Sequence, residues 1–167
     1  SSMGSLVGAY YAYGMLDELE DYVRKITALD SLRLVDVAFQ RAGGLMPGER
    51  IMKTLESASG GSFAEVRIED LPRRYAAVAT DLESGQEVWL QEGRLIDAIR
   101  TSISVPGIFT PVENKCLQGS GGSWLVDGGV SNPVPVSLCR AMGADVVIAV
   151  DLNRLMLQKP RRWGSDG

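Results

Sequence analysis

Two short, strongly apolar runs limit the fold of this chain more than any other feature. They lie at residues 75–80 and 144–150. A strand that is buried on both faces has this composition, because neither side of it meets water. Segments of helical periodicity separate the two runs along the chain. Helices that alternate with buried strands predict an α/β layered fold with a largely parallel central sheet.

The same patterns place the remaining elements. Helical spacing of apolar residues predicts helices over 6–13, 17–29, 49–58, 94–104 and 136–142, with 31–42 partly helical. Alternating or apolar runs predict further strands over 86–91, 112–117 and 123–126. Gly14 is expected to end the first helix, since glycine is the usual residue just past a helix. We expect one domain over residues 1–157, followed by a frayed tail at 158–167.

The first residues combine a serine, a glycine and the start of a helix. Ser2-Met3-Gly4, followed by an apolar segment, matches the second half of a Gly-x-Ser-x-Gly nucleophile elbow. An elbow holds its serine on a strained turn, next to the positive end of a helix dipole. The leading glycine is not in the sequence, which begins too late to include it. Alternatively, these residues could be a cloning remnant.

A second candidate site follows the strand predicted over 123–126. Asp127 stands there, directly before Gly128 and Gly129. In an open α/β sheet, catalytic groups collect at strand ends, and glycines let another group approach closely. The alternative is that Asp127 only caps a turn, as the aspartate of an Asp-Gly pair often does.

The composition excludes several classes of protein. The 167 residues contain no histidine, so neither a Ser-His-Asp triad nor a histidine-based zinc site can form within the chain. A net charge of −4 argues against a nucleic-acid partner. The two cysteines form no disulfide framework or metal cluster, which favours a reducing, cytoplasmic compartment. We therefore expect no metal or other cofactor, and a carboxylate as the base for Ser2.

Three ordered stretches together resemble the patatin-like phospholipase family, and most closely its small bacterial members. Residues 2–9 look like its nucleophile elbow, and residues 98–109 look like its internal helix and proline-containing stretch. Asp127-Gly128-Gly129 with Asn132-Pro133 looks like its catalytic aspartate motif. The resemblance covers nearly the whole chain. It implies a three-layer α/β fold whose N-terminal strand and glycine-rich oxyanion stretch precede residue 1.

The resemblance also implies a function. It is that of a serine lipid acyl hydrolase, in which Ser2 and Asp127 form a dyad and act through an acyl-enzyme. The oxyanion and turn would be supported by Met3, Gly4, Gly128 and Gly129. Without the preceding glycine-rich stretch, we expect these 167 residues alone to be nearly inactive. A non-catalytic lipid-binding or regulatory relative is the alternative. A general α/β-hydrolase is disfavoured, because its histidine is lacking.

The expected substrate is a neutral or zwitterionic acyl ester, met in peripheral contact with a membrane. Leu6, Val7, Tyr10 and residues 103–109 are candidates for groove walls, although an ordinary place in the core explains them equally well. The sequence does not determine the oligomeric state.

Overall fold

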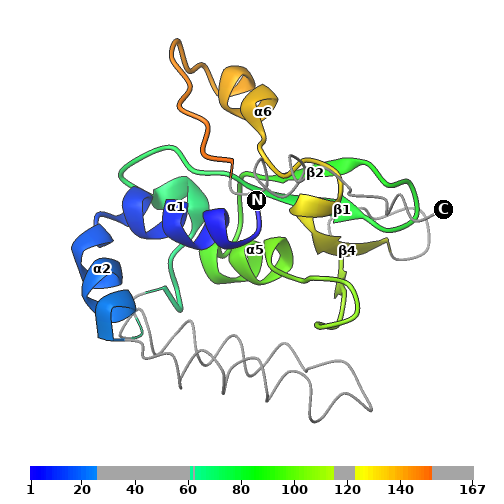
Figure 1. Ribbon diagram of the computed structural model, residues 1–167, viewed down its shortest axis with the longest axis horizontal. Coiled ribbons are helices and arrows are strands. Elements are labelled where there is room, and N and C mark those ends of the chain that lie inside the picture. The colour runs from blue at the N-terminus through cyan, green and yellow to red at the C-terminus, as the bar shows by residue number, and fades with distance from the viewer. Residues whose placement is uncertain (26–60, 62, 115–122, 152–167) are drawn as a thin grey trace, which may run out of the picture.

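The described strands form one four-stranded sheet. The computed structural model describes residues 1–25, 61, 63–114 and 123–151. Within them, the strands are β1 (Ala77–Asp81), β2 (Glu87–Leu90), β3 (Val112–Glu113) and β4 (Trp124–Asp127), in the order β2-β1-β4-β3 (Figure 1). Every described strand pair is antiparallel, so the expected largely parallel sheet is not confirmed. For β1 and β2 the reason is local, because they form a hairpin, whereas parallel neighbours need a long crossover connection.

Strand β1 is the centre of this sheet. Ala79 pairs with Val88 of β2 on one side and with Asp127 of β4 on the other. All five residues of β1 are buried, as the apolar run at 75–80 predicts, although the strand begins two residues later. Small and β-branched side chains suit this position, where both neighbouring strands are close. β1 therefore lies where it can hold groups from β4 in place.

Helices were predicted close to their observed positions. They are α1 (Met3–Tyr13), α2 (Leu16–Lys25), α5 (Leu95–Ser102) and α6 (Val136–Ala141), with the 3₁₀ turns η1 (Ile68–Asp70) and η2 (Gly128–Val130). Gly14 ends α1 at φ 92°, which confirms its predicted role. The helices expected over 31–42 and 49–58 lie outside the described residues, as do the last residues of the helix predicted over 17–29.

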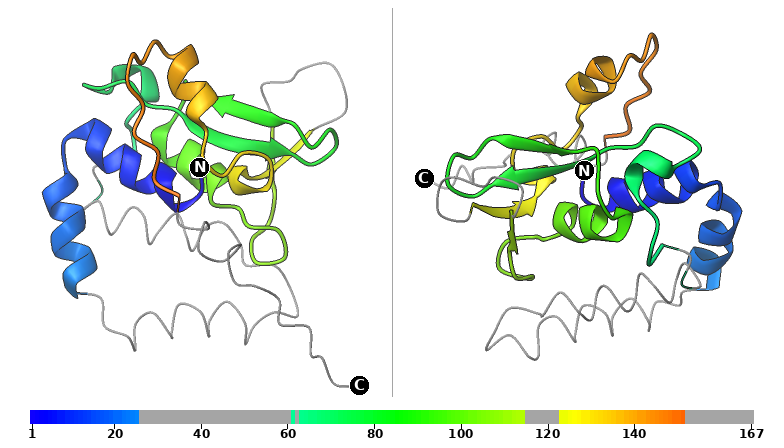
Figure 2. Two further views of the ribbon diagram at one scale, coloured as in Figure 1. Left: turned by 45° about the horizontal axis from the view of Figure 1, so that its top comes forward. Right: turned by 180° about the vertical axis from the view of Figure 1, so that it is seen from behind.

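The core lies between α1, α5 and the sheet. α1 and α5 run side by side in all three views, and α5 also packs on β1 and β4 (Figures 1 and 2). The Tyr10 and Phe63 rings meet edge to face with centroids 4.8 Å apart. Ile96 and Ile99 of α5 are fully buried in the same cluster. The later turns of α1 thereby pack on α5, which itself contacts the sheet.

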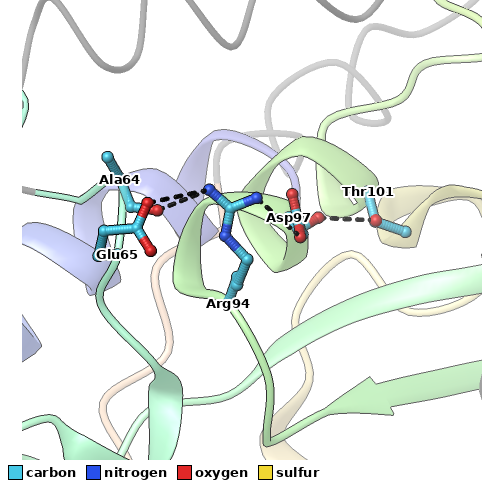
Figure 3. Close-up of polar contacts among 5 residues, drawn as sticks. All are labelled: Ala64, Glu65, Arg94, Asp97 and Thr101. Carbon is cyan, nitrogen blue, oxygen red and sulfur yellow. Dashed lines mark hydrogen bonds and ion pairs between the residues drawn. The ribbon is translucent and has the colours of Figure 1, made fainter.

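A polar network anchors the start of α5. Arg94 donates to the carbonyl oxygen of Ala64 at 2.7 Å, and the carboxylates of Asp97 and Glu65 lie 3.9 and 4.0 Å from its guanidinium (Figure 3). One turn further along, Thr101 Oγ1 donates to the carbonyl oxygen of Asp97 at 2.7 Å. These partly exposed ion pairs add little stability individually. Arg94 therefore contacts both the segment at 64–65 and the first turn of α5.

The prediction of a buried strand over 144–150 is wrong for the described structure. The segment leaves α6 and runs back toward the N-terminus without strand geometry (Figures 1 and 2). Val146, Ile148 and Val150 are 80, 89 and 74% exposed. Among the described residues no strand pairs with this segment, and a strand needs a neighbour for its backbone groups. An apolar sequence alone therefore does not make a buried strand here.

None of the described helices is both long and apolar enough to cross a membrane.

Candidate active site

Ser2 and Asp127 meet across almost the whole chain. Ser2 Oγ donates a hydrogen bond to Asp127 Oδ2 at 2.6 Å, although 125 positions separate the two residues. Ser2 stands immediately before α1, and Asp127 is the last residue of β4. Asp127 is 4% exposed, whereas Ser2 is half-buried and can still meet a ligand. The structure thus brings together the two residues that the sequence predicts as a dyad.

Ser2 has an unusual backbone conformation. Its φ of 51° and ψ of −134° make it the one non-glycine residue with positive φ in the described part of the chain. Such a conformation costs about 1–3 kcal/mol and persists only where neighbours hold it. Ser102 Oγ accepts the Ser2 N–H at 3.1 Å, and Ser5 Oγ donates to the Ser2 carbonyl oxygen at 2.6 Å. The peptide groups on both sides of the serine are therefore tied down.

A further hydrogen bond holds the N-terminal part of α1 in place. The buried hydroxyl of Tyr75 donates to the carbonyl oxygen of Ser5 at 3.0 Å. Burial raises the pKa of the Tyr75 phenol above its usual value, so the group remains a donor over the neutral range. This contact joins the segment before β1 to the first turn of α1.

Each oxygen of the Asp127 carboxylate has its own partner. Oδ2 faces Ser2, while Oδ1 accepts the backbone N–H of Gly129 at 2.6 Å and so caps η2. The two interpretations of Asp127 offered by the sequence, a partner for Ser2 and a turn cap, are therefore both met. Its backbone is also held, because its N–H donates to Ser104 and its carbonyl oxygen accepts from Thr80 Oγ1, both at 2.9 Å.

Steric constraints explain why two glycines follow Asp127. A Cβ on Gly128 would overlap the carbonyl oxygen of Val78 and come within 2.6 Å of its carbonyl carbon. A Cβ on Gly129 would lie 2.9 Å from Asp127 Oδ1. The expected role of these residues in close approach is thus visible in the structure. For Gly4 it is not, since no described atom outside its chain neighbours and its own helix backbone lies within 4 Å of the corresponding Cβ.

Met3 is the first residue of α1, directly after Ser2. The first N–H groups of a helix have no acceptor within the helix, and they carry the positive end of its dipole. The Met3 amide thus stands next to Ser2 at the N-terminal end of α1, and its predicted role toward an oxyanion stays a prediction. Its side chain is 60% exposed and takes no part in that argument.

Three hydroxyl groups that support the pair were not predicted. They belong to Ser5, Thr80 and Ser102, which are each at most 2% exposed. Thr80 Oγ1 donates to the Asp127 carbonyl oxygen and accepts the N–H of Ser131 at 3.2 Å, so it spans the turn. For Thr80 the sequence offered an indication, a hydroxyl residue in an apolar run, because a buried hydroxyl needs a hydrogen-bond partner.

The loop after α5 is held by a buried arginine. Arg100 donates to the hydroxyl of Ser104, and to the carbonyl oxygen of Thr110 at 2.9 Å. Burial lowers the pKa of its guanidinium from the usual value, although an arginine remains charged. Since the Ser104 carbonyl oxygen accepts the Asp127 N–H, Arg100 contributes to the site through this loop.

The groove-wall candidates divide between surface and core. Tyr10 is fully buried beside Phe63, so the alternative of an ordinary core residue is correct for it. Leu6 is half-buried, and Val7 is 47% exposed. Ile103 is buried, whereas Ile108 and Phe109 are half-buried.

No group of three or more potential metal ligands occurs within the described ranges. Cys139 is an unpaired thiol on α6, and Cys116 lies outside the described residues.

Comparison with known proteins identifies the family. The profile of the patatin-like phospholipase family matches residues 1–140. An uncharacterised NTE family protein of Mycobacterium bovis is 40% identical over 153 residues, which cover 92% of this chain and 39% of that protein. A second, from Mycobacterium tuberculosis, is 30% identical over 159 residues, or 92% of this chain and 24% of that protein. Patatin-like phospholipase domain-containing protein 7 of Rattus norvegicus is 34% identical over 96 residues, or 58% of this chain and 7% of that protein.

The chain thus spans about two-fifths or less of the curated relatives it matches. The family match begins at residue 1, so the opening serines belong to the family sequence rather than to a cloning remnant. With a match over residues 1–140 of 167, this chain belongs to the patatin-like phospholipase family.

Proposed function

We propose that the intact protein is a serine lipid acyl hydrolase whose nucleophile is Ser2 and whose base is Asp127. One observation carries the proposal: Ser2 Oγ donates to Asp127 Oδ2 at 2.6 Å. A nucleophile within hydrogen-bond reach of its base is the geometry that nucleophilic catalysis requires. Family membership supports a lipid ester as the substrate class.

The reaction follows from this contact. Ser2 Oγ attacks the ester carbonyl carbon while its proton passes to Asp127 Oδ2. The tetrahedral intermediate then breaks its bond to the alcohol oxygen, which takes the proton from Asp127. An acyl-enzyme remains. Water attacks it, gives a proton to Asp127 and releases the fatty acid, and Ser2 recovers its proton.

The start of α1 suits the charge that develops during this reaction. The carbonyl oxygen of the intermediate becomes negative, and the Met3 amide with the helix dipole is favourably placed beside Ser2. The strained backbone of Ser2 fits this role, since strain concentrates at functional sites. We expect a neutral or zwitterionic lipid as the substrate, reached from the cytoplasmic side in peripheral contact with a membrane.

Two substitutions test the dyad in the intact protein. Ser2→Ala should abolish hydrolysis of a short-chain nitrophenyl ester and labelling by a fluorophosphonate probe. Asp127→Asn should lower kcat about a hundred- to ten-thousandfold, as expected on loss of a general base. The double variant should be hardly worse than Ser2→Ala, because the two residues act as one unit.

Asp97→Asn is the matched control, since that carboxylate is more than half exposed and lies on α5. It should retain full activity. Unchanged hydrolysis by Asp127→Asn would refute the dyad. A folded intact protein that binds lipid vesicles but neither hydrolyses esters nor reacts with the probe would support a non-catalytic, lipid-binding relative instead.

A further inference from the structure

Ser102, the last residue of α5, links the backbone of Ser2 to strand β1. Its side chain is fully buried. Its hydroxyl donates to the carbonyl oxygen of Val78 at 2.7 Å and receives the N–H of Ser2 at 3.1 Å. A serine hydroxyl has one proton, and a carbonyl oxygen can only accept. The directions of both hydrogen bonds are therefore fixed, and Ser102 acts as an acceptor toward Ser2.

The N–H that Ser102 binds belongs to Ser2, the one non-glycine residue with positive φ among the described residues. Ser2 has φ 51°, and its Oγ must stay aligned with Asp127 Oδ2 at 2.6 Å. Rotation about φ moves the side chain relative to the N–H, so a fixed N–H limits where Oγ can lie. Ser102 thus acts on the backbone of Ser2, while Asp127 acts on its side chain.

Hydrogen bonds connect both Ser2 and Asp127 to strand β1. The Val78 carbonyl oxygen holds Ser2 through Ser102, and the Thr80 hydroxyl holds the carbonyl oxygen of Asp127 at 2.9 Å. Val78 and Thr80 are two positions apart on the central, fully buried strand β1. A rigid strand that reaches both residues fixes the distance between them more firmly than loops could.

We propose that Ser102 is a positioning residue, which keeps the backbone of Ser2 in the conformation that aims Oγ at Asp127. The proposal rests on the proposed function of the pair. It gives a role to a residue within the stretch 98–109, to which the sequence resemblance assigned none.

The test compares Ser102→Ala with Thr101→Val in the intact protein. Thr101 is a neighbour on α5 whose buried hydroxyl also donates to a carbonyl oxygen at 2.7 Å, but to that of Asp97 (Figure 3). Both variants lose one buried hydrogen bond to a carbonyl group. Only Ser102→Ala also loses the acceptor for the Ser2 N–H.

With a short-chain nitrophenyl ester, Ser102→Ala should lower kcat about ten- to a hundredfold and leave KM within about twofold. The rate of fluorophosphonate labelling should fall in parallel. Thr101→Val should keep both rates within about twofold. Ser102→Thr, which retains the hydroxyl, should restore most of kcat. If the alanine variant does not fold, Ser102→Cys serves in its place, because it fills the same space with a weaker acceptor.

Equal losses in Ser102→Ala and Thr101→Val, or a change confined to KM, would overturn the proposal. A crystal structure of Ser102→Ala gives a readout independent of activity: we expect Ser2 to leave positive φ, and retention of both φ and the contact with Asp127 would also overturn it. Failure of the dyad is recognised separately, by unimpaired hydrolysis in Ser2→Ala.

Discussion

Strand β1 and the segment 144–150 have similar compositions and opposite environments. β1 consists of Ala-Val-Ala-Thr-Asp, and each residue is buried. The other segment contains Val-Val-Ile-Ala-Val at 146–150, yet Val146 is 80% exposed and Ile148 is 89% exposed. β1 lies between β2 and β4, whereas no described strand pairs with 144–150. The difference shows that burial of an apolar run depends on its neighbours.

Polar groups of β1 also have partners on neighbouring elements. The carbonyl oxygen of Val78 accepts a hydrogen bond from Ser102 of α5, and the hydroxyl of Thr80 donates to the carbonyl oxygen of Asp127 in β4. Those contacts are what place Ser2 and Asp127 together. The central strand is therefore both fully buried and the support of the candidate site. Three predictions test this contrast.

Gly128→Ala should have the largest effect. The added Cβ would overlap the Val78 carbonyl group, and neither backbone can move without disturbing β1 or Asp127. We expect the free energy of unfolding to fall by about 3 kcal/mol or more, at or above the top of the usual range for overpacking. Hydrolysis should be lost with it. Urea unfolding of the intact protein measures the change.

Gly8→Ala is the control for that experiment. A Cβ there would meet Tyr75 at 3.5 Å, which is an ordinary contact, and Gly8 lies inside α1. Alanine should be neutral or stabilise the protein by up to about 1 kcal/mol. Similar unfolding curves for the two variants would mean that Gly128 is not sterically required.

A matched pair of valines gives a smaller effect. Val78 is fully buried in β1, so Val78→Ala should lower the free energy of unfolding by about 1.5–3 kcal/mol. Val146→Ala removes the same atoms from an exposed position and should change it by less than about 0.5 kcal/mol. A large loss from Val146→Ala in the intact protein would show that other residues cover the segment, and would remove the contrast.

Asp81, the last residue of β1, should make the stability of the fold depend on pH in the acid range. Asp81 accepts hydrogen bonds from the Ser123 hydroxyl and from the N–H and hydroxyl of Ser84, which lower its pKa from 3.8 to about 2. A depressed carboxyl pKa stabilises the folded state above the unfolded value. This contribution is therefore present above about pH 4 and is lost as the pH falls toward 2.

Asp81→Asn tests this assignment. Its thermal midpoint should be lower than that of the unmodified protein at pH 5, and the difference should shrink as the pH approaches 2. The exposed Asp97→Asn variant should follow the unmodified protein throughout. Parallel curves for Asp81→Asn and the unmodified protein would contradict the role of Asp81.

Much of the local structure could be predicted from the sequence, because it depends on neighbouring residues. Helical spacing located α1 and α5, and Gly14 gave the end of α1. The strand directions could not be predicted in the same way. They depend on which strands become neighbours, and an apolar run such as 144–150 contains no information about its partner.

The candidate site shows the same limit. Ser2 and Asp127 could be selected because their glycine-containing motifs are local, and the absence of histidine left a carboxylate as the base. Ser102 and Thr80 could not be selected, since their hydroxyls act across 100 and 47 positions of the chain. Such contacts become visible only when the fold brings the segments together.

The two oxygens of the Asp127 carboxylate have different hydrogen-bond partners, and this limits which of them can carry the proton. Oδ1 is occupied by the Gly129 N–H at 2.6 Å, and an oxygen that accepts so short a bond is poorly placed to carry a proton toward that donor. In the proposed reaction the proton therefore resides on Oδ2 alone. Because Gly129 occupies the other oxygen, the oxygen of the leaving alcohol must come within hydrogen-bond reach of Oδ2 to take up the proton.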